Sequence, residues 1–134
     1  MNFRLLFVLL GICALSALIL ILYLFALEYY LYWTVWWYDV MLHFLGGIII
    51  GAVLVWILAR FFPQSMSLRR MLTVVVMTAL TIGLGWELFE YSAGMMGGGG
   101  NLIKDTIIDL CMDVLGSIAA YLIVYRITRK HFIK

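Results

Sequence analysis

The chain has 134 residues, of which 66% are hydrophobic and only 12% are charged. This composition excludes an ordinary soluble or disordered chain and is typical of a small integral membrane protein. The net charge of +2 gives no sign of a nucleic-acid partner, and we expect none.

Four apolar segments approach or exceed the roughly 20 residues that a helix needs to cross a bilayer. They cover residues 3–27, 40–62, 71–93 and 106–127. We therefore predict an all-α protein, an integral membrane four-helix bundle that forms one transmembrane domain over residues 1–134. In the first segment an apolar run follows Arg4, as in a secretory signal, but its length and its end at Leu27-Glu28-Tyr29 favour a retained helix.

The basic residues are distributed unevenly along the chain. The first connection between segments has no Lys or Arg, and the third has only Lys104. The others lie at the termini and in the second connection: Arg4, Arg60, Arg69, Arg70, Arg126, Arg129, Lys130 and Lys134. By the positive-inside rule, both termini and the second connection are predicted to be cytoplasmic.

The connections differ in composition. Seven aromatic residues crowd the first: Tyr29, Tyr30, Tyr32, Trp33, Trp36, Trp37 and Tyr38. They indicate either an interfacial belt or an aromatic rim that receives a lipid or polycyclic substrate. Ser67 in the second connection is a candidate N-cap of the third helix. The third contains Gly97-Gly98-Gly99-Gly100, which suits a flexible linker or a mobile lid.

Six of the seven acidic residues lie at helical spacing in, or just before, the last three apolar segments. They are Asp39, Glu87, Glu90, Asp105, Asp109 and Asp113. A carboxylate in hydrocarbon is costly, so intramembrane acids normally face a bundle interior, a water-filled cavity or a cation. Small residues on the same helical faces, such as Gly47, Gly83 and Gly116, indicate that these faces point toward neighbouring helices. With the predicted topology, the three faces meet in the outer leaflet.

Clustered carboxylates cannot all stay ionised and unpaired in a medium of low dielectric constant. Only Lys104 lies near them, so their counter-charge must come from protons or bound cations. We predict a divalent-cation site, with Mg²⁺, Mn²⁺, Fe²⁺, Ca²⁺ and Zn²⁺ not distinguished. Its candidate ligands are Asp39, His43, Glu87, Glu90, Asp105, Asp109 and Asp113.

Several of these residues also have purely structural interpretations. Asp39 and Asp105 are candidate helix caps, because both lie near a helix N-terminus. Glu90 suits an interfacial position, and His43 suits a buried, hydrogen-bonded histidine. Glu87, Asp109 and Asp113 are the hardest to explain structurally, and they are our candidate catalytic residues.

The chain resembles the YjdF-type bacterial inner-membrane family in three motifs: Asp39-Val-Met-Leu-His43-Phe44, Trp86-Glu87-Leu-Phe-Glu90 and Asp105-Thr-Ile-Ile-Asp109-Leu-Cys-Met-Asp113-Val-Leu-Gly116. It is also similar to the VanZ-like family, whose pattern is Asp-x-x-x-His, Glu-x-x-Gln and Asp-x-x-x-Asn-x-x-Gly. Here Glu90 replaces Gln and Asp113 replaces Asn, which fits the YjdF type better. The resemblance implies a role at the cell envelope and a bacterial inner membrane, and it covers roughly residues 37–121.

Three functions follow as alternatives. The first is a metal-dependent hydrolase or phosphoryl-transfer enzyme, which acts in the outer leaflet on a lipid or envelope substrate. The second is a small proton- or cation-coupled transporter. The third is a noncatalytic envelope accessory protein with a structural metal. The expected partners are membrane lipid and, for the carrier, further copies of the chain as a homo-oligomer.

Overall fold

The computed structural model describes residues 3–62, 67–95 and 101–128. This part of the chain is helical, without strands: α1 (Phe3–Glu28), α2 (Leu31–Thr34), α3 (Trp36–Phe61), α4 (Leu68–Ala93) and α5 (Leu102–Thr128). The four long helices are each long and apolar enough to cross a membrane. The prediction of an all-α, four-span membrane protein is therefore confirmed, and the side that its termini face stays a prediction from charge.

The last three long helices begin earlier than predicted, at Trp36, Leu68 and Leu102 rather than at positions 40, 71 and 106. The apolar pattern marks the part of a helix that suits hydrocarbon, whereas backbone hydrogen bonding continues through interfacial residues to the cap. The short helix α2 was not predicted either. It lies in the aromatic first connection, where hydrophobicity carries no helical period.

The helix caps were predicted correctly at one position and wrongly at two. The Ser67 hydroxyl accepts a hydrogen bond from the backbone N–H of Arg70 at 3.4 Å, so Ser67 caps α4 as expected. Asn101 caps α5 in place of Asp105, since its Oδ1 accepts from the backbone N–H groups of Ile103 (3.1 Å) and Lys104 (3.3 Å).

Asp39 is not a cap, because α3 starts at Trp36 and its N-cap residue is Val35. Asp39 and Asp105 both lie in the first turn of a helix, where a carboxylate interacts favourably with the helix dipole. Helix α4 ends at Ala93, where the following residue, Gly94, adopts the left-handed conformation with φ 67°.

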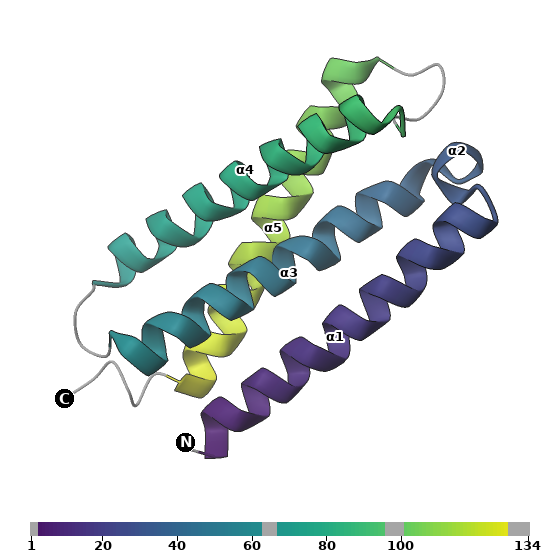
Figure 1. The fold of residues 1–134 in the computed structure, drawn as a ribbon. Coiled ribbons are helices and arrows are strands. Elements are labelled where there is room, and N and C mark those ends of the chain that lie inside the picture. Colours follow the sequence, from purple (N-terminus) through teal and green to yellow (C-terminus); the bar gives the residue numbers. More distant parts are fainter. Residues whose placement is uncertain (1–2, 63–66, 96–100, 129–134) are drawn as a thin grey trace.

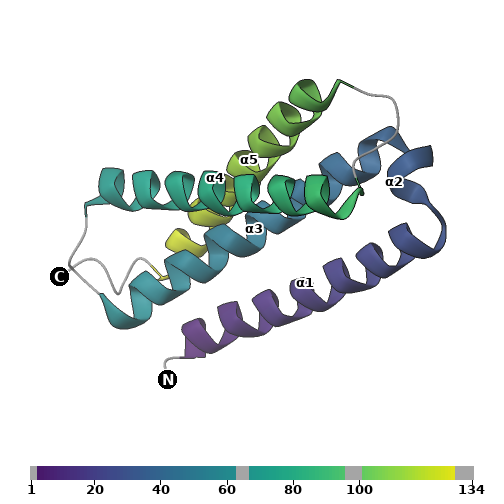
Figure 2. The same cartoon turned by 45° about the horizontal axis from the view of Figure 1, so that its top comes forward.

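Helix α3 is the centre of the bundle and packs against α1, α4 and α5 (Figures 1 and 2). Its most extensive contact is with α5. A Cβ atom added at Gly47 would overlap the backbone of Asp113, and one added at Gly116 would overlap the backbone of Phe44. The two helix backbones therefore touch at the level of Asp113, the close approach that small residues allow in membrane proteins.

Helix α1 joins the bundle mainly through α3 and, more weakly, through α2 and α5. Two aromatic side chains of α3 hold it near its ends: the Tyr38 hydroxyl donates to the Leu22 carbonyl and the Trp56 indole N–H donates to the Leu5 carbonyl, both at 2.9 Å. The only buried residues of α1 are Leu5, Val8 and Ala26. Between them α1 is only partly buried, with Ile12 and Ile19 packed against the buried clusters.

Candidate metal centre

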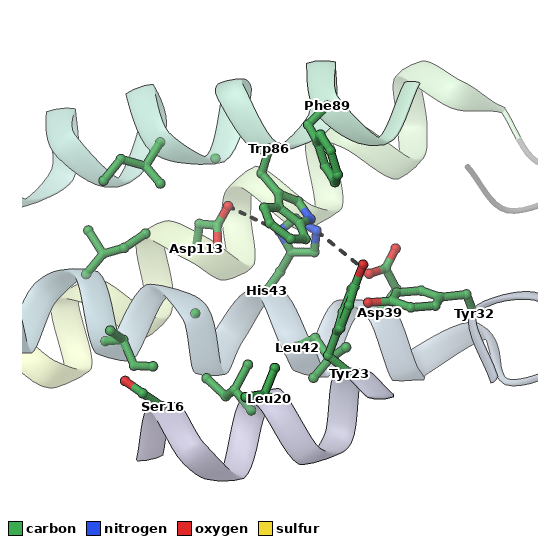
Figure 3. Close-up of a pocket in the computed structure, with 16 residues that line it drawn as sticks. Ser16, Leu20, Tyr23, Tyr32, Asp39, Leu42, His43, Trp86, Phe89 and Asp113 are labelled. Atoms are coloured by element: carbon green, nitrogen blue, oxygen red, sulfur yellow. Dashed lines mark hydrogen bonds and ion pairs between the residues drawn. The ribbon is translucent and has the colours of Figure 1, made fainter. Parts of the chain in front are cut away.

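His43, on the second turn of α3, is the centre of the acidic cluster and is only 5% exposed. Its Nδ1 lies 3.2 Å from Oδ2 of Asp113 on α5. Its Nε2 lies 3.8 Å from Oδ1 of Asp39, one turn earlier on α3 (Figure 3). The same nitrogen lies 3.6 Å from Oε1 of Glu87 on α4. Three helices thus bring their acids to one imidazole, as helical spacing predicted.

Three polar atoms at this site have no hydrogen-bond partner although they are buried. In the part of the chain that the structure describes, the buried side-chain N and O atoms without a partner are His43 Nε2, Glu87 Oε1 and Asp109 Oδ1. Each of these three residues also offers a ligand atom, and the three ligand atoms all lie within 4.8 Å of one another. An unsatisfied buried polar atom costs about 1–3 kcal/mol, and more when charged, so three together demand an explanation. A cation shared by His43, Glu87 and Asp109 would satisfy all three.

Two further side chains orient the carboxylates of α4. The Thr106 hydroxyl donates to Oε2 of Glu87 at 2.7 Å, which leaves Oε1 directed at the histidine. The Trp86 indole N–H donates to Oε1 of Glu90 at 2.8 Å. Sequence reasoning missed both roles. Thr106 carried a usable signal, because it precedes Asp109 by three residues and so shares its helical face.

The remaining predicted ligands lie around this centre. Asp39 and Glu90 form a second group with His43, and Asp39, Asp105 and Asp109 form a third. Asp105 is exposed and lies at the edge, whereas Glu90 is buried. The structure therefore brings all seven predicted ligands together around the centre, and their binding of metal stays a prediction.

Tyr32 of α2 lies beside the acidic end of the bundle. Burial raises the pKa of its phenol, and the carboxylates of Asp39 and Glu90 raise it further. The phenol therefore keeps its proton at neutral pH. Among the other aromatic residues of the first connection, Tyr38 is buried. The rest are exposed and suit an interfacial belt, as Trp36 does with 84% of its surface exposed.

A cavity of about 500 Å³ lies next to the centre, between α1, α3 and α4 (Figure 3). Asp39, His43 and Asp113 form its acidic wall. The rest of its lining is mostly apolar and includes Leu20, Ile50, Ile82 and Phe89. A smaller cavity of about 170 Å³ reaches Glu87 and Thr106 from the other side, between α4 and α5. The centre is thus approached from two sides.

The fold and the cluster define a class: a multi-pass membrane protein with a buried His/carboxylate centre at one end of its bundle. The chain belongs to the family described as "Predicted membrane protein (DUF2238)", whose model matches residues 3–130. No curated protein and no solved structure matches the chain. The family description gives no activity, and the narrower resemblance to YjdF-type and VanZ-like proteins stays a prediction.

Proposed function

We propose that the chain is a divalent-cation-dependent membrane protein that catalyses hydrolysis or phosphoryl transfer on a lipid or envelope substrate. One observation carries the proposal. The three buried atoms without a partner belong to His43, Glu87 and Asp109, the one candidate ligand group that is buried throughout among the described residues. Buried nitrogen and oxygen atoms that face one another without water or a hydrogen-bond partner cost free energy, unless a cation lies between them.

Each residue has a distinct task in this centre. Nε2 of His43, Oε1 of Glu87 and Oδ1 of Asp109 are the proposed ligand atoms, a set that suits Mg²⁺, Mn²⁺, Fe²⁺, Ca²⁺ or Zn²⁺. Asp113 and Thr106 position His43 and Glu87 through hydrogen bonds. A divalent ion, when bound, supplies Lewis-acid polarisation of a phosphoryl oxygen or of water.

Asp39 is the best candidate for the general base. Its side chain is 23% exposed, lines the larger cavity and lies one helical turn from His43. The other carboxylates nearest the imidazole, Glu87 and Asp113, are almost fully buried and already engaged by Thr106 and His43. A substrate in the cavity would therefore meet Asp39 first.

The described residues favour an enzyme over a transporter. The half of the bundle away from the acids has an apolar core that includes Val55, Met71 and Val75. Its buried hydroxyl groups are already engaged, since Thr128 donates to the Val124 carbonyl, Ser117 to the Val114 carbonyl and Tyr121 to the Leu68 carbonyl. A transported ion or proton needs polar groups along its whole path, and these few engaged hydroxyl groups are too sparse to form one.

We also propose that the centre faces the outside of a bacterial inner membrane, where VanZ-like envelope proteins would act. In support, Arg60, Arg69, Arg70 and Arg126 all lie at the end of the bundle opposite the acids. A Tyr30→Cys variant without the native cysteines should react with a membrane-impermeant thiol reagent in intact cells, and a Ser67→Cys variant should not. The reverse labelling pattern would place the acids on the cytoplasmic side.

Metal analysis of the purified protein tests the centre directly. We expect about one divalent ion per chain, or stoichiometric Mn²⁺ uptake by the metal-free protein. Glu87→Gln and Asp109→Asn should abolish this binding, whereas Glu28→Gln, which removes an exposed acid at the end of α1, should not. Uptake that is unchanged in both site variants would refute the centre.

Catalysis needs a second measurement, because a structural metal would use the same ligands. Purified protein with Mn²⁺ should release headgroup or phosphate from a lipid substrate, and Asp39→Asn should lose this activity while it keeps the ion. Stoichiometric metal without any turnover across phospholipid classes would favour the accessory role instead.

A further inference from the structure

The larger cavity is a groove that runs along α3 from the acidic end toward the middle of the membrane. On α3 its lining extends from Asp39 to Ile50. At a rise of 1.5 Å per residue, this stretch is about 16 Å long. A bilayer core is about 30 Å thick, so the groove has the depth of one leaflet.

The walls of the groove divide by polarity along this length. Its ionisable residues, Asp39, His43 and Asp113, lie toward the end with the proposed metal centre. Farther along, the lining is apolar apart from the Ser16 hydroxyl and includes Leu20 of α1, Ile49 and Ile50 of α3 and Ile82 of α4. A ligand that fits this division has a charged head and an apolar tail.

The groove lies between two helices that do not pack extensively against each other. Helices α1 and α4 both contact α3 but are not among the well-packed helix pairs of the described chain. The rings of Tyr23 on α1 and Trp86 on α4 bridge them edge to face, with centroids 6.3 Å apart (Figure 3). The Trp86 indole N–H also donates a hydrogen bond to Glu90, so this aromatic bridge lies next to the acidic end. Along the rest of its length, the groove lies between the candidate membrane-spanning helices α1, α3 and α4.

The size of the groove decides between a lipid chain and a partner helix. A transmembrane helix is about 10–12 Å in diameter and must continue for about 30 Å. A groove of about 500 Å³ that ends near Ile50 and Ile82 is too small for it. A single hydrocarbon chain is narrow, needs no hydrogen bonds and spans one leaflet.

We propose that this groove holds one hydrocarbon chain of a lipid from the leaflet on the acidic side, with the lipid's phosphate at the metal centre. The inference rests on the proposed centre, because an anionic phosphate would be repelled by Asp39 and Asp113 without a cation there. It identifies the substrate class as a phosphate-bearing membrane lipid. It also makes the groove-lining residues of α1 and α4 determinants of specificity.

Photo-crosslinking in nanodiscs tests the occupant. The probe is a trace of phosphatidic acid with a diazirine in one acyl chain, in phosphatidylcholine nanodiscs with Mn²⁺, and labelled residues are located by mass spectrometry. We expect adducts on Leu20, Ile50 and Ile82 at roughly ten times the level on outward-facing residues such as Ile21 and Ile123. Equal labelling of all apolar surfaces, or a protein–protein adduct in the groove, would overturn the proposal.

A matched pair of variants separates the groove from the surrounding bilayer. Ile50→Trp fills the groove below the acids and should reduce its labelling roughly tenfold. Ile21→Trp makes the same change on the outward surface of α1 and should leave groove labelling unchanged. If Ile50→Trp does not fold, Gly46→Leu fills the same groove, with Gly85→Leu as control because a Cβ at Gly85 meets no atom within 4 Å.

The phosphate is tested by a diacylglycerol probe with the same labelled chain. Groove labelling by phosphatidic acid should require Mn²⁺, and diacylglycerol should label weakly whether or not Mn²⁺ is present. Equal labelling by the two probes would overturn the placement of the phosphate. Metal content is measured on the same samples: an empty wild-type centre refutes the proposed function, whereas a filled centre beside an unlabelled groove refutes this inference alone.

Discussion

His43 and Asp113, seventy positions apart in the chain, meet through Nδ1 and Oδ2 at 3.2 Å with both side chains buried. An ionised Asp113 can only accept, so the imidazole donates from Nδ1, and in the neutral ring Nε2 then carries the lone pair, on the side of Glu87. This is the arrangement in which a carboxylate orients a metal-binding histidine. In the proposed centre Asp113 would therefore position His43, and its binding of the ion itself, which its spacing predicted, stays a prediction.

Replacement of Asp113 should weaken the metal site without abolishing it. Loss of a carboxylate that orients a ligating histidine typically costs about 10–100-fold in metal affinity. We expect Asp113→Asn to raise the Mn²⁺ dissociation constant by this factor, as measured by titration with electron paramagnetic resonance. Asp109→Asn should lose binding altogether. An Asp113→Asn protein with no detectable Mn²⁺ affinity would make Asp113 a direct ligand.

The Thr106 hydroxyl should support metal binding by holding the Glu87 carboxylate in position, since the hydroxyl itself carries no charge. Thr106→Val keeps the shape of the side chain but removes the donor to Oε2 of Glu87. We expect Mn²⁺ affinity to fall by about tenfold in Thr106→Val, and Thr106→Ser to restore it because serine supplies the same hydroxyl. Equal affinities in the valine and serine variants would show that the hydrogen bond does not matter.

Much of this fold can be predicted from the sequence, because a small number of simple rules govern membrane helices. Apolar length located the four spans, and helical spacing placed His43 beside Asp39, Glu87 and Asp113. It could not reveal which nitrogen of His43 meets which carboxylate, since that depends on the rotation and closeness of α3 and α5. The distance between those two helices is set by Gly47 on α3 and Gly116 on α5 together, so it cannot be predicted from the sequence of either helix alone.

The groove was beyond sequence reasoning for a different reason. Its lining comes from all five helices, and it lies where α1 and α4 do not pack extensively against each other. Hydropathy is nearly uniform along α1, so nothing in its sequence marks Leu20 as facing a cavity and Ile21 as facing outward. The aromatic run held a similar ambiguity, which the inward position of Tyr38 and the exposure of Trp36 resolve residue by residue.

The close approach of α3 and α5 predicts a sharp difference between two glycine substitutions. A Cβ at Gly47 would overlap the backbone of Asp113, which cannot move aside as a flexible side chain would. Overpacking of this kind costs about 1–3 kcal/mol, so Gly47→Ala should lower the Tm in detergent by several degrees. It should also weaken Mn²⁺ binding, because Asp113 shifts with its backbone.

Gly85→Ala is the matched control, since a Cβ there meets no atom within 4 Å. Alanine favours a helix over glycine by about 1 kcal/mol, so this variant should be as stable as the parent or slightly more stable. Equal Tm values for Gly47→Ala and the parent would contradict the tight contact between α3 and α5.

Removal of the metal should destabilise the bundle, because His43, Glu87 and Asp109 then keep buried polar atoms without partners. A ligand that binds only the folded state stabilises it by about 2.7 kcal/mol when its concentration is 100 times its dissociation constant. We expect a chelator to lower the Tm of the purified protein and excess Mn²⁺ to restore it. Asp109→Asn should show a Tm that responds to neither treatment, because it lacks a ligand for the ion. A Tm that responds to Mn²⁺ equally in the parent and in Asp109→Asn would instead indicate binding at a different place.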